Sequence, residues 1–80
     1  MNRACRCCGY LTLEAHAEYE ICGVCFWEDD GQDGSNADEV PGGPNGDLSL
    51  TMAQENYRTF GACERRYIVS VRLPSASELP

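Results

Sequence analysis

The stretch from Cys5 to Cys25 reads CRCCGYLTLEAHAEYEICGVC and contains two Cys-x-x-Cys pairs. Cys5 pairs with Cys8, Cys22 pairs with Cys25, and 13 residues separate the two pairs. Two cysteines three positions apart can present both sulfurs to one ion from a single tight turn. Two such pairs at this separation are typical of a four-thiolate metal site. The spacing therefore predicts that these four cysteines bind one metal ion.

The segment between the pairs predicts a zinc-ribbon hairpin. Residues 10–13 and 19–21 are rich in aromatic and branched apolar side chains, which favour strands. They are long enough for two short strands joined by a turn near residues 15–18. Gly9 follows the first pair and Gly23 lies inside the second, where a metal-binding turn needs a positive φ or close backbone approach.

The identity of the ion stays open between zinc and iron. Four thiolates suit a closed, structural Zn²⁺ site, but ligand softness also allows iron, as in rubredoxin-type turns. Zinc is favoured because Phe26 and Trp27, rather than a glycine, follow the second pair. Two disulfides are the other alternative, although nothing in the sequence suggests secretion.

The length and charge limit the class of protein. Eighty residues make one domain whose core is small, so a stabilising metal is expected. The formal net charge is −7, with six arginines and no lysine. Residues 1–55 carry a net charge of −9 and residues 56–80 carry +2. This sign disfavours nucleic-acid binding, which needs a positive surface, and favours a basic protein partner.

The sequence also predicts a compartment. The N-terminus is polar and its first apolar run is interrupted by cysteines, so no signal peptide is expected. No window is long and apolar enough for a membrane span. We expect a cytoplasmic protein, where thiols stay reduced and bind metals more often than they form disulfides.

Two cysteines remain after the metal site is assigned. Cys7 lies between two expected ligands and Cys63 follows the expected helix. Both are interpreted as inert thiols, and the alternative is a redox pair. His16 lies in the expected turn and is interpreted as a surface residue. Phe26 and Trp27 are interpreted as core residues packed over the metal site, with an interface anchor as the alternative.

Residues 28–47 form a long polar segment with six acids between positions 28 and 39. An EF-hand alignment starting at Asp29 loses the ligands at positions 3 and 12, so calcium binding of that kind is excluded. The segment is interpreted as a solvated acidic loop. The alternative is that Asp29, Asp30 and Asp33 form a binding surface for a basic protein partner.

The remainder is expected to be helical. Residues 48–60 predict a helix with a capping box at Thr51 and Gln54 and a stop at Gly61. Residues 62–73 suit a short helix or, by their β-branched content, a strand, and the helix is preferred. We expect the helical part of the domain to cover residues 50–73 and the tail 74–80 to fray.

Four arginines lie in this C-terminal half. Arg58, Arg65 and Arg72 repeat every seven residues, and Arg66 adjoins one of them. They are interpreted as solvated charges paired with the acidic half. The alternative is a patch for phosphate or nucleic acid.

Several motifs resemble one known family. CRCCGYLTLE, ICGVCFWEDDG, ENYRTFGAC and VRLP resemble the bacterial cysteine-rich proteins named for a Cys-Pro-Cys-Cys motif, over about residues 5–74. Arg6 replaces the name-giving proline, which puts the rigidity of the first turn in doubt but removes no ligand. The resemblance implies a small metal-binding protein and gives almost no biochemical function.

Together these features predict a small α+β domain spanning residues 1–80. It would be a zinc-ribbon or rubredoxin-like β-hairpin with two cysteine turns and one or two C-terminal helices. The first functional hypothesis is a non-catalytic, acidic interaction module, for example an immunity or antitoxin-like protein, built around one structural Zn²⁺. The second is a thiol redox protein or sensor that uses Cys7 and Cys63. The third and weakest is a nucleic-acid-associated zinc ribbon. One histidine and no nucleophile elbow argue against hydrolytic catalysis.

Overall fold

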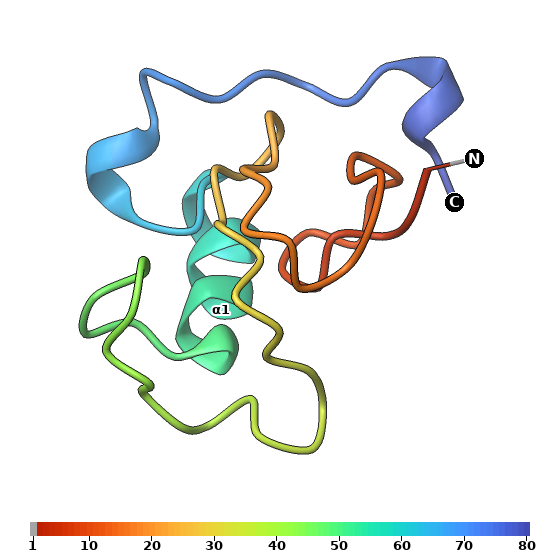
Figure 1. Cartoon of the computed structure of the whole chain (residues 1–80). Helices are drawn as coiled ribbons and strands as arrows, with labels where there is room; N and C mark the ends of the chain where they lie inside the picture. The colour runs from red at the N-terminus through yellow and green to blue at the C-terminus, as the bar shows by residue number, and fades with distance from the viewer. Residues whose placement is uncertain (1) are drawn as a thin grey trace.

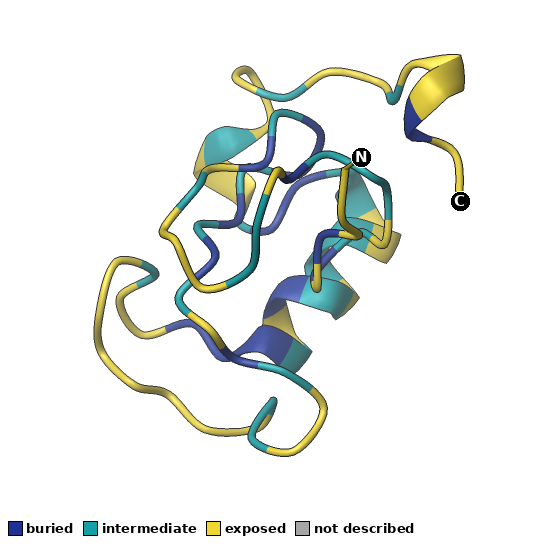
Figure 2. Ribbon diagram, turned by 45° about the vertical axis from the view of Figure 1, so that its right-hand side comes forward, coloured by how far each residue is buried: buried dark blue, intermediate teal, exposed yellow. Residues whose placement is uncertain are grey.

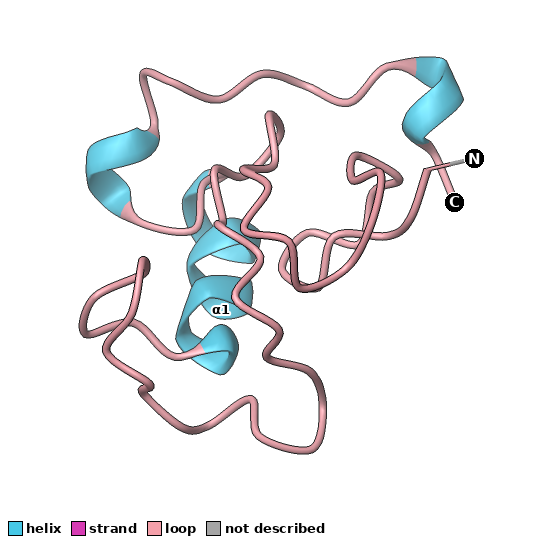
Figure 3. Cartoon of the chain, in the orientation of Figure 1, coloured by secondary structure: helices cyan, strands magenta, loops and turns pink. Residues whose placement is uncertain are grey.

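The structure is a computed structural model that describes residues 2–80. It contains one α-helix, α1 (Leu50–Phe60), and two short 3-10 helices, η1 (Arg65–Tyr67) and η2 (Ala76–Glu78). The rest of the described chain forms turns and irregular segments, as Figure 3 shows. In Figure 1 the loop 28–47 lies at one end of α1, while residues 68–75 cross the opposite side of the molecule.

The predicted hairpin between the cysteine pairs is wrong, because residues 2–80 contain no strand. Two isolated antiparallel bridges are present instead, Arg3 with Leu13 and Ile21 with Glu28. Each bridge flanks one cysteine pair, so each pair closes its own small loop. The two pairs are therefore separate turns rather than the two ends of one hairpin.

Contacts with Asp29 explain why the strand expected over residues 19–21 does not form after the turn at residues 15–18. Ala17 and Tyr19 have φ values of 61° and 59°, in the left-handed region that strands exclude. The Ala17 amide donates to Asp29 Oδ2 at 2.8 Å, and the Tyr19 amide donates to the Asp29 carbonyl oxygen at 3.0 Å. Asp29 is 1% exposed, and a buried carboxylate requires such donors. A contact from beyond the segment thus decides its conformation.

The prediction of a helix before Gly61 is confirmed by α1, but its cap differs. Ser49 is the N-cap, and its side chain accepts a hydrogen bond from the Met52 amide at 3.1 Å. Gln54, expected in a capping box with Thr51, instead donates to the Arg6 carbonyl oxygen at 2.9 Å. Gly61 ends the helix with φ 83°, a conformation that glycine adopts without strain.

The helix predicted over residues 62–73 is wrong, since only η1 is helical there. The Cys63 amide donates to the Cys25 carbonyl oxygen at 2.8 Å, which directs the chain onto the second cysteine turn. Ile68, Val69 and Val71 follow η1, and β-branched residues lose side-chain freedom in a helix.

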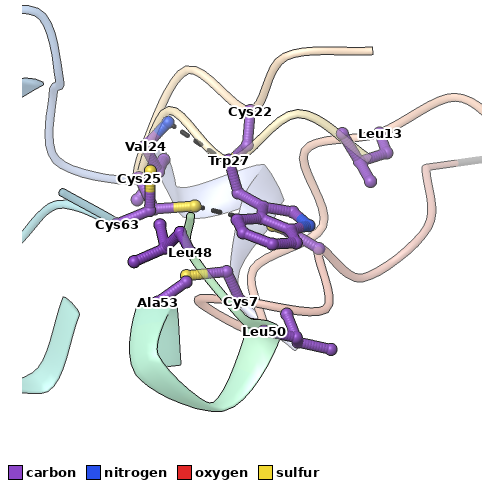
Figure 4. Packing of buried hydrophobic residues seen from close by; sticks show 11 residues of the cluster. Cys7, Leu13, Cys22, Val24, Cys25, Trp27, Leu48, Leu50, Ala53 and Cys63 are labelled. Atoms are coloured by element: carbon purple, nitrogen blue, oxygen red, sulfur yellow. Dashed lines mark hydrogen bonds between the residues drawn. The ribbon is translucent and has the colours of Figure 1, made fainter. Parts of the chain in front are cut away.

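The core lies between the cysteine turns and α1. Trp27 is its largest fully buried side chain, and Leu13, Val24 and Leu50 are buried with it. Figure 4 shows Trp27 lying among the residues of this cluster, and Figure 2 shows α1 burying one face. Among the helices described, none has the length and apolar character needed to cross a bilayer.

The loop 28–47 is held by its own polar side chains. Asn45 bonds both backbone groups of Glu28, accepting from the amide at 3.2 Å and donating to the carbonyl oxygen at 2.8 Å. Gln32 donates to the carbonyl oxygens of Asn36 and Glu39 at 2.9 and 2.7 Å. The bonds of Asn45 join the two ends of the loop, and the bonds of Gln32 hold residues 32–39 together. The segment therefore has a defined shape despite its lack of regular structure.

Candidate metal centre

Cys5, Cys8, Cys22 and Cys25 form a cluster in which all four sulfurs lie within 4.8 Å of one another. The Cys5 and Cys25 sulfurs are 3.6 Å apart, and the Cys8 and Cys22 sulfurs are 3.7 Å apart. A tetrahedron with metal–sulfur bonds of about 2.3 Å has sulfur–sulfur edges of about 3.8 Å. The cluster can therefore hold a tetrahedral ion, and the distances suit zinc and iron equally. None of the six cysteines forms a disulfide.

The two cysteine turns repeat the same backbone pattern. The Gly9 amide donates to the Cys5 carbonyl oxygen, and the Phe26 amide donates to the Cys22 carbonyl oxygen, both at 2.8 Å. The residue after each pair has a positive φ, 85° at Gly9 and 70° at Phe26. Phe26 thus takes the conformation that glycine takes in the first turn, so its presence does not distinguish the second turn from a rubredoxin-type turn.

This geometry predicts an unusual order of stability at position 26. An L-residue in the left-handed region costs about 1–2 kcal/mol relative to glycine. Phe26→Gly should therefore be more stable than Phe26→Ala by about 1 kcal/mol, although both lose the ring contact with Tyr67. Urea unfolding of the metal-loaded variants followed by circular dichroism measures the difference.

The exposed helical position Thr59 supplies the control for this comparison, because alanine is favoured over glycine in a helix by about 1 kcal/mol. The order Ala above Gly at both positions would contradict the positive φ of Phe26.

Cys22 receives the most support from its surroundings. The Thr12 hydroxyl donates to its sulfur at 3.0 Å and the Val24 amide at 3.4 Å. The pKa of Cys22 is lowered because the sulfurs of Cys25, Cys5 and Cys8 hydrogen-bond to it. The pKa of each of these three partners is raised, chiefly because each faces the Cys22 sulfur. Without a cation, the four thiols therefore cannot ionise together, so binding a divalent ion would release protons.

The two remaining cysteines are outside this cluster. Cys63 is fully buried, and burial raises the pKa of its thiol to about 12. Cys7 is buried with an exposed fraction of 8%. A reactive thiol needs exposure, and both side chains are buried. His16 is also outside the cluster, since its Nε2 lies 3.1 Å from the Ala4 carbonyl oxygen.

The two aromatic candidates, Phe26 and Trp27, differ in how far they are buried. Trp27 is fully buried and offers no surface. Phe26 is half-buried and stacks on Tyr67 with a centroid distance of 4.6 Å. These positions favour the core interpretation of both side chains over the interface anchor.

The acidic candidates mostly organise their own loop. Asp29 is buried and accepts from Ala17. Asp30 accepts from the Gln32 amide at 3.1 Å, and Asp33 accepts from the Ser35 amide at 2.8 Å. The hydrogen bonds from Ser35 also lower the pKa of Asp33. An aspartate commonly accepts a hydrogen bond from the amide two residues later in a turn, so the roles of Asp30 and Asp33 could be predicted from the sequence. The burial of Asp29 could not be predicted from the sequence.

The arginine candidates have local contacts. Arg65 lies over the Phe60 ring at 4.7 Å and Arg66 over the Tyr67 ring at 4.7 Å. Arg66 also pairs with Glu64 at 2.7 Å. Arg58 is exposed on α1. Among residues 2–80, the ion pairs of this half are thus made within residues 64–78 rather than with the acidic loop.

One helix packed on two matching cysteine turns defines a small cysteine-rich domain whose four-sulfur cluster can hold a metal ion. The chain matches the family model described as cysteine-rich CPCC over residues 3–78, and it belongs to that family. The family resemblance read from the sequence is thereby confirmed. Searches of curated proteins and of solved structures gave no match. Arg6, in place of the proline, does not prevent the first turn from closing in the same way as the second.

Proposed function

We propose that this protein is a non-catalytic module in which Cys5, Cys8, Cys22 and Cys25 hold one structural Zn²⁺. The observation that carries the proposal is the sulfur arrangement, in which Cys5–Cys25 and Cys8–Cys22 separations of 3.6 and 3.7 Å are close to the edges of a tetrahedral site. Four cysteine sulfurs leave no open position for water or substrate, which is the character of structural rather than catalytic zinc.

The second part of the proposal is that the acidic surface binds a basic protein, as a small immunity or antitoxin-like protein would. The net charge of −7 supports a basic partner because long-range attraction accelerates association. Since Asp29 is buried, a partner would meet the exposed acids of the loop instead. Glu39 and Asp47 are exposed, and their carboxylates make no hydrogen bond among the described residues.

A surface hollow beside the end of the loop suits one basic side chain. It has a volume of about 360 Å³, and Leu48 and Met52 supply apolar walls. Asp47 supplies a carboxylate at the same hollow, whereas the Glu64 carboxylate there is paired with Arg66. A lysine or arginine side chain could lay its apolar stem on the walls and its charge against Asp47.

Charge neutralisation tests the interaction. A double variant with Glu39→Gln and Asp47→Asn should weaken binding to a partner captured from the native cytosol by about 10-fold and reduce the salt dependence of binding. The control is Glu14→Gln with Glu55→Gln, which removes the same charge from exposed acids outside the loop. Failure to capture a partner, or equal salt dependence in both double variants, would refute the acidic docking surface but leave the metal site standing.

A further inference from the structure

The C-terminal segment 72–78 connects the two cysteine turns. Its first residue, Arg72, donates its amide to the carbonyl oxygen of Gly23, inside the second turn, at 3.2 Å. Its last residue, Glu78, accepts from the amide of Leu11, just after the first turn, at 2.8 Å. The segment thus contacts the backbone at both turns whose sulfurs must stay together.

An ion pair closes this segment on itself. Arg72 Nη1 and Nη2 bind Glu78 Oε1 and Oε2 at 2.7 and 2.8 Å. Glu78 Oε1 also accepts from the Ser75 amide at 2.8 Å, as part of a capping box at η2. Two-point guanidinium–carboxylate pairs fix orientation as well as charge, and the Glu78 side chain is only 11% exposed. The end of the chain, expected to fray, is therefore tied down at this point.

The guanidinium of Arg72 lies directly against the second cysteine turn. A Cβ atom added to Gly23 would lie 3.2 Å from Arg72 Nε and 3.3 Å from Nη2, so only glycine gives it room without a shift. The pKa of Arg72 is raised by its bonds to Glu78. A Zn²⁺ with four thiolates carries a formal charge of −2, which an adjacent cation stabilises.

We propose that Arg72, fixed by Glu78, is a positioning residue of the cysteine site, and that segment 72–78 controls how slowly the bound metal leaves. The inference rests on the proposed metal site. Groups outside the ligand set hold ligands in place and alter metal affinity, by about 10–100-fold in other sites. Here they also hold together two turns that are far apart in the sequence.

The test is the rate at which metal passes from the loaded protein to excess chromophoric chelator. We expect Arg72→Gln and Glu78→Gln to release metal about 10-fold faster than the unaltered protein, while still binding one ion per chain. Gly23→Ala should act in the same direction, because it displaces the guanidinium without touching a sulfur. Arg58→Gln and Gly43→Ala are the matched controls, since no atom of the described chain lies within 4 Å of a Cβ added at Gly43.

Salt tests whether the Arg72–Glu78 pair carries the effect. Rising ionic strength should accelerate release from the unaltered protein toward the rate of Arg72→Gln, because ions weaken an ion pair whose arginine side chain is 53% exposed. Release rates equal to those of the controls would overturn the inference. If Arg72→Gln does not fold, Gly23→Ala decides the question alone. Absence of metal in the unaltered protein would instead refute the proposed function.

Discussion

A protein with Cys22→Ser should lose its metal and its cooperative unfolding. The serine hydroxyl does not ionise at neutral pH, and the site would lose the sulfur that Thr12 and Val24 support. Apparent metal-binding free energies of about 10–16 kcal/mol in small zinc domains appear as folding free energy. In a domain of 80 residues this loss is large enough to unfold the chain. Metal content and far-ultraviolet circular dichroism measure the two effects.

Cys7→Ser supplies the matched control, since the same chemical change falls between two ligands of the first turn. It should keep one metal per chain and a folded spectrum, because the Cys7 sulfur is outside the four-sulfur cluster. Full metal loading of Cys22→Ser would contradict the ligand assignment. Loss of metal from Cys7→Ser would show that the cluster has been assigned to the wrong set of sulfurs.

Trp27→Ala should cost about 3–5 kcal/mol in the free energy of unfolding, the range for deleting a large buried aromatic side chain. Trp27 has 0% exposure and lies among the core residues that join the cysteine turns to α1. A domain of this size is stable by only about 4–12 kcal/mol, so much of its stability would be lost. Urea unfolding of the metal-loaded protein, followed by circular dichroism, measures the change.

Two further variants sharpen this prediction. Trp27→Phe should cost less, because Trp27 Nε1 is buried without a hydrogen-bond partner among the described residues and no bond is lost. Val69→Ala, at a side chain that is 93% exposed, should change stability by less than about 0.5 kcal/mol. If Trp27→Ala were as mild as Val69→Ala, the core would not be centred on Trp27.

Local patterns in the sequence predicted the features that depend on neighbouring residues. The Cys-x-x-Cys spacing places two sulfurs on one tight turn whatever the rest of the chain does, so the four-cysteine cluster could be foreseen. Helix α1 was also predicted correctly, because Gly61 ends a helix by adopting a positive φ, which requires no long-range contact. The N-cap was misassigned by two positions, since Ser49 and Thr51 are chemically similar caps.

Long-range contacts decided the features that the sequence did not reveal. Residues 19–21 carry strand-forming side chains, yet Tyr19 has a positive φ and donates its amide to the Asp29 carbonyl oxygen. The bond from Cys63 to Cys25 directs residues after Gly61 away from a helix. The pair between Arg72 and Glu78 orders a tail whose composition suggests fraying. Each contact joins residues whose proximity no local pattern encodes.

Metal content is the most direct test of the proposed site. Protein purified without added metal or nickel resin would be subjected to elemental analysis and to alkylation counting, first folded and then denatured with chelator. The proposed function predicts one zinc per chain, Cys5, Cys8, Cys22 and Cys25 protected in the folded protein, and six reactive thiols after denaturation. Iron, or no metal together with fewer than six free thiols, would contradict a structural zinc site.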